Sequence, residues 1–179
     1  MADVVRVSAA EFEQLTQNDE RRFELIEGEI TEMPPPKIVH QRLLGRLFRI
    51  VDDLKPSGEV FFAPVKVYLD EYNIPQPDLV WVSANSACQI EELRLVGAPD
   101  LVIEILSPGT AKRDKTDKFK LYEKHGTREY WLVDPEYNQI EVWRRGANGF
   151  ERQGIYGVGD TFKSAALGKS VDVSPIFNS

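Results

Sequence analysis

Apolar residues recur with the period of a helix in three segments of the chain. A capping box formed by Ser8 and Glu11 predicts a first helix that continues to about Thr16. A second helix is expected over residues 40–54, where apolar residues form a broad stripe. A third is expected over residues 111–125, because Gly126 suits the position just after a helix end.

Strand patterns dominate the remainder of the chain. Residues 22–26 and 29–33 flank Glu27-Gly28 and predict a hairpin. Further strands are expected over 59–64, 66–70, 77–82, 100–106, 128–133, 139–145, 150–156 and about 170–173. Residues 83–97 have no clear period and are expected to form a loop with a short helical turn. The order of elements predicts one α/β (α+β) domain over residues 1–179, in which helices flank a mixed β-sheet.

A single glutamate interrupts the most apolar of these strands. Residues 101–106 are aliphatic except for Glu104, and such a run is typical of a strand buried on both faces. A buried ionised carboxylate is costly unless it is paired with a cation or binds a metal. Glu104 is therefore expected to contact either a divalent metal ion or a Lys or Arg side chain.

Asp78 and Asp100 both occur in the sequence Pro-Asp-Leu-Val, at the start of a predicted strand. Asp100 lies four residues before Glu104, about 13 Å along the strand, which is too far to share one ion. We expect Asp100 to serve the turn that precedes its strand. Neighbouring strands are about 4.8 Å apart, so Asp78 can share a cation with Glu104 if their strands pair. Oxygen ligands suit Mg²⁺ or Mn²⁺; the alternative for Asp78 is a structural role.

The helix over residues 111–125 supplies positive charge next to Glu104. At about 100° per residue, one side of it carries Lys118 together with Ala111, Lys115, Phe119 and Tyr122. Lys118 is therefore a candidate catalytic cation, and Lys115 is its rival. The alternative is that Lys118 forms an ordinary ion pair, for instance with Asp114 one turn earlier.

Composition limits the kinds of site and partner. The single cysteine, Cys88, excludes an internal disulfide and a cysteine-based zinc site, and two histidines are too few for a histidine-rich metal centre. The net charge of −7 argues against a nonspecific nucleic-acid binder, although a local basic patch can still hold a phosphate backbone. No segment approaches the ~20 apolar residues of a membrane span, and the start lacks a signal-peptide pattern. A cytoplasmic protein without a membrane partner is expected.

The order of these residues resembles a nuclease motif. Pro77-Asp78, then Glu104 and then a lysine are similar to the PD-(D/E)xK nuclease superfamily. More closely, the chain resembles the Uma-type restriction endonuclease family over about residues 8–173. The matching segments are 22–29, 33–36, His40-Gln41, 99–110, Arg113-Asp114, Lys118, Tyr122, Gly126 and 129–135. The superfamily places its lysine two residues after the glutamate, where this chain has Leu106; Lys118 matches the family position instead.

The resemblance implies a restriction-endonuclease-like fold and a Mg²⁺- or Mn²⁺-dependent DNA endonuclease. A homodimer is expected as well, because cutting two strands is simplest with two sites related by symmetry. Asp78 and Glu104 would hold the metal, and Lys118 would orient the attacking water or stabilise developing charge. Glu24 would add a carboxylate, whereas simple alternation with its neighbours favours an exposed position for it. His40 would either begin the helix over residues 40–54 or lie near the site.

Two other functions remain open from the residues alone. One is a catalytically inactive nucleic-acid-binding or interaction protein on a nuclease scaffold, which Leu106 and the net charge favour. The other is a metal-dependent hydrolase of a small phosphoester, because a fold does not define a substrate.

Overall fold

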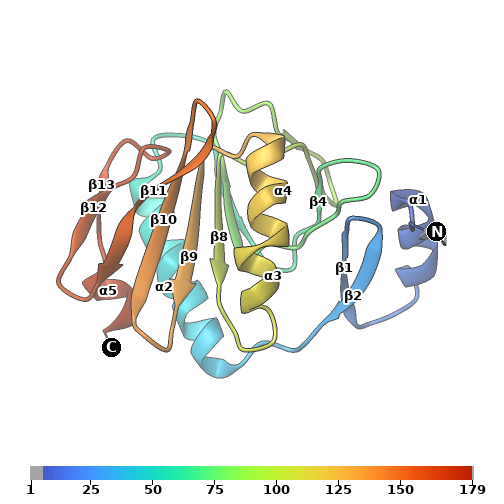
Figure 1. The fold of residues 1–179 in the computed structure, drawn as a ribbon, viewed down its shortest axis with the longest axis horizontal. Coiled ribbons are helices and arrows are strands. Elements are labelled where there is room, and N and C mark those ends of the chain that lie inside the picture. The colour runs from blue at the N-terminus through green and yellow to red at the C-terminus, as the bar shows by residue number, and fades with distance from the viewer. Residues whose placement is uncertain (1–5, 179) are drawn as a thin grey trace.

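A six-stranded sheet forms the centre of the computed structural model, which describes residues 6–178 (Figure 1). The strand order across the sheet is β11-β10-β9-β8-β5-β3. These strands are β3 (Glu59–Phe62), β5 (Leu79–Val82), β8 (Leu101–Ile105), β9 (Glu129–Asp134), β10 (Gln139–Gly146) and β11 (Gly149–Gly157). Strands β8 and β9 pair in parallel and the other neighbours pair antiparallel, so the sheet is mixed, as predicted.

Helices cover both faces of this sheet. The long helix α2 (Ile38–Leu54) lies behind it in Figure 1, and α3 (Ala111–Lys115) and α4 (Asp117–His125) lie in front. Alternate residues of β8 therefore enter two cores: Leu101, Ile103 and Ile105 pack with α2, whereas Val102 packs with Tyr122 of α4. Glu104 has the same parity as Val102, so its side chain belongs to the α4 face.

The N-terminal elements and a small second sheet pack beside the main sheet, on the right in Figure 1. They are α1 (Ala9–Thr16), the hairpin of β1 (Arg22–Ile26) and β2 (Glu29–Met33), and the three-stranded sheet of β4 (Val67–Tyr68), β6 (Gln89–Ile90) and β7 (Leu95–Val96). Leu25 and Ile74 exchange backbone hydrogen bonds of 3.1 and 2.7 Å, and both pack with Phe12. These contacts bring β1, and with it Glu24, towards the main sheet.

The C-terminal elements complete the core on the α2 side. The hairpin of β12 (Thr161–Lys163) and β13 (Ser170–Asp172) leads to the short helix α5 (Ser174–Phe177). Phe162, Val171 and Ile176 are buried in the same cluster as α2, and Arg46 of α2 donates a 3.1 Å hydrogen bond to the carbonyl of Ile176. The tail is thus part of the packed structure.

The structure corrects several predicted boundaries. The helix expected over residues 111–125 is two helices, broken at Thr116, whose backbone (φ −122°, ψ −72°) leaves the helical region and whose hydroxyl donates to the carbonyl of Lys112. The break leaves Lys115 exposed and Lys118 buried. Residues 83–97 contain β6 and β7 instead of a helical turn. The sequence pattern does not predict these strands, because two-residue strands are too short to show a period. Neither β12 nor α5 was predicted.

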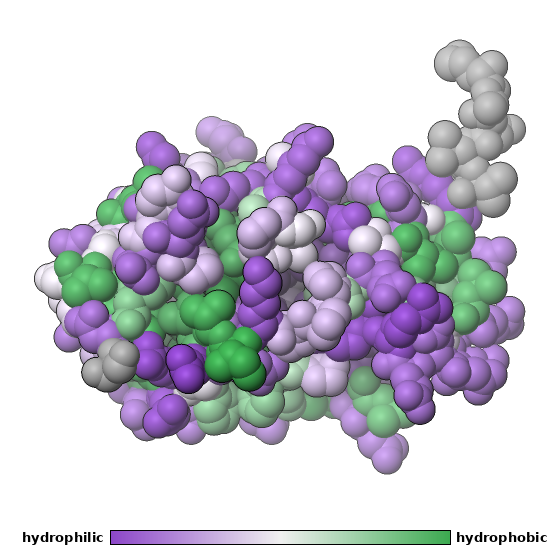
Figure 2. All heavy atoms as spheres, turned by 90° about the horizontal axis from the view of Figure 1, so that it is seen from below, coloured by the Kyte–Doolittle hydropathy of each residue, from purple (hydrophilic) through white to green (hydrophobic). Residues whose placement is uncertain are grey.

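The molecular surface carries both hydrophobic and hydrophilic residues. Figure 2, the view from below, shows hydrophobic residues in separate patches between hydrophilic ones. The exposed large apolar side chains include Ile38 and Val39 of α2 and Phe62 of β3. Among the described residues 6–178, no helix is long and apolar enough to cross a membrane.

Candidate active site

The pairing of β5 with β8 brings two carboxylates together. Leu79 lies opposite Ile103 in this antiparallel pair, and continuing the register places Asp78 opposite Glu104. Residues directly opposite each other point to the same face, with Cβ atoms roughly 4.5–5.5 Å apart. The backbone N–H of Ile105 donates a 2.7 Å hydrogen bond to Oδ2 of Asp78, which holds its carboxylate against β8. The two strands are neighbours, as sharing one cation requires.

Lys118 lies at the centre of the acidic cluster that surrounds this pair. Its Nζ is 3.1 Å from Oε1 of Glu104, 3.0 Å from Oε2 of Glu24 and 3.4 Å from Oδ1 of Asp114. The side chain is only 1% exposed. Tyr122, one turn further along α4, donates a 3.3 Å hydrogen bond to the same oxygen of Glu104. Lys115, the rival candidate, is exposed and forms no contact with these carboxylates.

Glu24 is buried, at 2% exposure, so the exposed position expected from strand alternation is wrong. Alternation assumes that one face of the hairpin contacts water, and here other segments cover that face. Arg113 of α3 places NH1 3.4 Å from Oε1 of Glu24, and the backbone N–H of Gln76 donates to Oε2 at 3.4 Å. The structure therefore adds Glu24 and Arg113 to the cluster.

His40 lies beside Asp78 and is not the residue that begins α2. The helix starts at Ile38, after Lys37 as N-cap, so His40 is its third residue. Nε2 of His40 is 3.0 Å from Oδ1 of Asp78, and its side chain is 17% exposed. Of the two roles that the sequence allowed, the structure places His40 at the site.

The charges of the cluster do not balance. Burial raises the pKa of Glu104 well above its usual range; Lys118 opposes that shift, and Asp114, Asp78 and Glu24 add to it. Burial likewise raises the pKa of Asp114, against the opposing charge of Lys118. Burial alone would lower the pKa of Lys118, but Glu104, Glu24 and Asp114 outweigh it and raise that pKa well above its usual range. The ammonium form of Lys118 is therefore favoured by an excess of carboxyl groups around it.

This excess of carboxylates has the chemistry of a divalent-cation site. Oδ1 of Asp114 is buried without a hydrogen-bond partner, although Lys118 Nζ lies 3.4 Å away, so a single ammonium faces Glu104, Glu24 and Asp114. In the part of the chain that is described, no three His, Cys, Asp or Glu side chains are arranged to hold a metal ion by themselves. Mg²⁺ commonly binds to one or two carboxylates and keeps several waters. Asp78 and Glu104 fit that pattern, and a complete protein cage is absent from residues 6–178.

Asp100 and Leu106 lie outside the cluster. Asp100, at the other end of β8, accepts a 2.9 Å hydrogen bond from the backbone N–H of Ser83 and lies 3.4 Å from Arg128 NH1. This is the structural role expected of it at the strand start. Leu106, at the usual superfamily lysine position, is buried in the apolar core beneath α4. The only lysine that reaches Glu104 in residues 6–178 comes from α4.

Comparisons with known proteins agree with this architecture. A 143-residue stretch, 78% of this chain and 81% of the relative, is 25% identical to the uncharacterized protein sll1609 of Synechocystis sp.. The crystal structure of "a putative nuclease belonging to DUF820" from Anabaena variabilis has a TM-score of 0.78 and 22% identity, and covers 96% of this chain and 97% of that one. That likeness confirms the predicted fold. Residues 9–174 match the family Uma2, described as "Putative restriction endonuclease". Because the match spans nearly the whole chain, the protein belongs to the Uma2 family, as its motifs predicted.

Proposed function

We propose that the protein is a Mg²⁺- or Mn²⁺-dependent endonuclease that hydrolyses phosphodiester bonds of DNA. The observation that carries this proposal is the cluster itself: Asp78 and Glu104 are paired across β5 and β8, with Lys118 Nζ 3.1 Å from Glu104. Membership of the Uma2 family supports a nuclease reaction. A buried excess of carboxyl groups is typical of sites that function with a cation.

Asp78 and Glu104 are the residues that would hold the metal. When bound, the ion would polarise the phosphate and lower the pKa of a bound water. The Ile105 N–H and His40 keep Asp78 in place, and Lys118 and Tyr122 do the same for Glu104. Such supporting contacts define the orientation of a ligand before the ion arrives.

Two cations of the cluster have different access to a substrate. Lys118 is buried and forms ion pairs with Glu104 and Glu24, so it is placed to donate to a water or oxygen beside Glu104. Arg113 is 29% exposed and lies at the outer side of Glu24. Its guanidinium is therefore suited to contact a phosphate oxygen, because arginine matches phosphate geometry.

Plasmid cleavage tests the proposal. Supercoiled DNA is incubated with Mg²⁺ or Mn²⁺ and with wild type, Glu104→Gln, Lys118→Met and the control Asp100→Asn. We expect at least a ~100-fold loss of cleavage in the first two variants, because each loses a charge that acts on the reacting phosphate. Asp100→Asn should remain active, since Asp100 lies outside the cluster. Circular dichroism checks folding, and cleavage that persists in both cluster variants would contradict the assignment.

A second function, nucleic-acid binding without cleavage, is favoured by the burial of Lys118 and by Leu106 in the usual lysine position. Absence of cleavage on every DNA and RNA form, with no divalent-ion binding by calorimetry, would support it. Hydrolysis of a small aryl phosphodiester without any action on DNA would support the small-phosphoester alternative.

A homodimer is part of the proposal. Cutting both strands of a duplex is simplest with two sites related by a twofold axis. Light scattering at several protein concentrations tests this, and a monomer at all of them would contradict it.

A further inference from the structure

The exposed charge around α3 and α4 is opposite in sign to that of the chain. The net charge of the protein is −7. Between residues 111 and 152, however, seven exposed side chains are Lys or Arg and three are Asp or Glu. The acidic residues are Asp117, Glu136 and Glu151. The basic residues are Lys112, Lys115, Lys120, Lys124, Arg128, Arg145 and Arg152.

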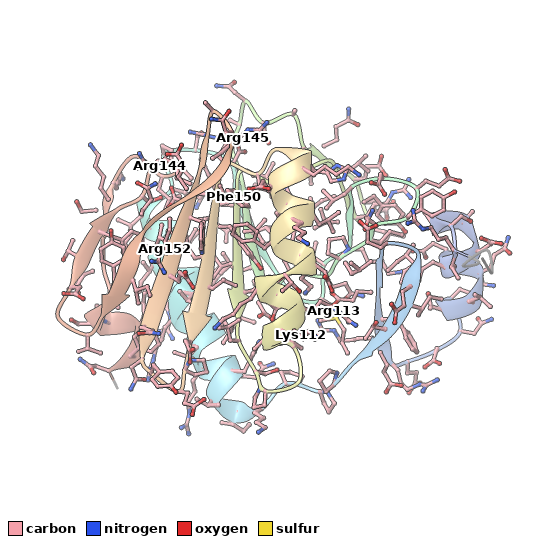
Figure 3. The ribbon with its side chains drawn as sticks, in the orientation of Figure 1. Lys112, Arg113, Arg144, Arg145, Phe150 and Arg152 are labelled. Carbon is pink, nitrogen blue, oxygen red and sulfur yellow. The ribbon has the colours of Figure 1, made fainter. Side chains whose placement is uncertain are left out.

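Six of these cations lie on α3, α4 and the β10–β11 hairpin, and we call them the basic face: Lys112, Lys115, Lys120, Lys124, Arg145 and Arg152. The lysines lie on α3 and α4, and the arginines lie on β10 and β11. The β10–β11 hairpin packs against α4. Phe119 of α4 contacts Trp143 and Phe150 of the hairpin, with ring centroids 4.8 and 5.1 Å apart. Figure 3 shows Lys112 and Arg113 at the lower end of α3 and Arg145, Phe150 and Arg152 on the neighbouring hairpin.

Most of the cationic side chains of the basic face contribute little to the stability of the fold. Among the described residues, Lys112, Lys115, Lys120 and Arg145 form no salt bridge. Lys124 lies 3.7 Å from Asp70 and Arg152 lies 3.5 Å from Glu141, and exposed pairs of this kind contribute little to stability. These exposed side chains are therefore free to contact a ligand of opposite charge.

The basic face adjoins the acidic cluster through the same two helices. Asp114 and Lys118 point inward to Glu104, whereas Lys112 and Lys115 point outward. Arg113, between them, contacts Glu24 and remains partly exposed. At 1.5 Å per residue, residues 111–125 span at most about 22 Å, which corresponds to roughly six base pairs measured along the axis of a duplex. A backbone lying along them would pass beside Arg113.

We propose that the basic face binds the phosphodiester backbone of duplex DNA and presents it to Asp78 and Glu104. The choice of DNA rests on the proposed function, but binding itself requires no cleavage. Charge complementarity and the length of the helices favour an extended polyanion as the ligand, and the chain's overall negative charge would keep other surfaces from binding it.

Duplex binding without metal tests this surface. Fluorescence anisotropy with a labelled duplex of about 20 bp is measured in EDTA between ~50 and ~200 mM NaCl, where phosphate contacts change affinity strongly. The variant carries Lys112→Gln, Lys115→Gln and Lys120→Gln; the control carries Arg49→Gln, Lys163→Gln and Lys169→Gln. Both lose three exposed positive charges, and glutamine preserves helix propensity.

We expect the basic-face variant to bind at least ~10-fold more weakly than wild type, with a salt slope reduced by about 2–3, whereas the control stays within about threefold. Equal weakening in both variants, at unchanged thermal stability, would overturn the inference. So would an absence of binding by wild type at ~50 mM NaCl. Face-dependent binding together with an inability to cut DNA in Mg²⁺ would support the inference and contradict the proposed nuclease function.

Discussion

The two ends of β8 carry carboxylates with opposite environments. At Asp100, burial acts to raise the pKa, but hydrogen bonds from Ser83 and Ser86 and the charge of Arg128 outweigh it, and the pKa is lowered. At Glu104, burial outweighs the charge of Lys118 and the pKa is raised. Both side chains have the same parity along the strand, so parity does not distinguish them. The difference is that Glu104 is buried beside Asp114, Asp78 and Glu24, whose charges add to the effect of burial, and a carboxylate perturbed in this way is the candidate functional one.

Removing the cationic partner of each carboxylate should give the largest difference in stability between the two ends of β8. Lys118→Met would leave Glu24, Glu104 and Asp114 buried without their ammonium, so we expect a loss of about 3–5 kcal/mol in the free energy of unfolding. Arg128→Met removes a half-exposed partner of Asp100 and should cost at most ~1 kcal/mol. Urea denaturation followed by circular dichroism measures both. Equal losses would show that the two ends do not differ in this way.

A divalent cation should stabilise one end only. Mg²⁺ bound to the folded state raises the free energy of unfolding by about 2.7 kcal/mol at 100 times its dissociation constant. We therefore expect the melting temperature of wild type and Asp100→Asn to rise with Mg²⁺ relative to EDTA, and that of Glu104→Gln to rise much less. An identical rise in both variants would place the ion elsewhere.

Substitution of His40 tests whether metal binding depends on the contact between His40 and Asp78. His40→Ala should weaken Mn²⁺ binding by about 10–100-fold, the usual cost of losing a contact that orients a metal ligand. His40→Gln retains an N–H donor that can reach Asp78 and should restore most of the affinity. Isothermal titration calorimetry gives the dissociation constants. If the alanine variant binds Mn²⁺ like wild type, the contact with Asp78 is only structural.

Apolar runs and local turn and cap signals made much of the fold predictable. Apolar runs identified β5 and β8, the hairpin of β1 and β2 followed from Glu27-Gly28, and the capping box at Ser8 is present. The failures have local causes that the apolar period does not record. Two-residue strands are too short to show a period, and the break at Thr116 involves a hydrogen bond from its hydroxyl to the carbonyl of Lys112.

The candidate site was accessible from sequence only where burial conflicted with charge. Glu104 stands out because its strand is otherwise apolar, and spacing along the helix then indicates Lys118. Glu24 and His40 give no such signal, since each lies in a segment with ordinary polar neighbours. Their proximity to Lys118 and Asp78 arises from packing between elements distant in sequence. The catalytic roles of all these residues stay predictions.

The smallest expected difference between the two ends of β8 is their effect on the pKa of the Cys88 thiol. Burial raises the pKa of its thiol from 9.0 to about 11, and the charge of Asp100 adds to this shift. A raised folded-state pKa means that the thiol is protonated at pH 8, and that its contribution to stability is lost as pH rises from about 9 to about 11. The pH dependence of iodoacetamide labelling, which follows the thiolate, measures this pKa.

Asp100→Asn should lower the pKa of Cys88 slightly but keep it above 9.0, since burial remains the larger cause. Glu104→Gln should leave it unchanged, and an equal shift in both variants would show that Asp100 is not the local source of that charge.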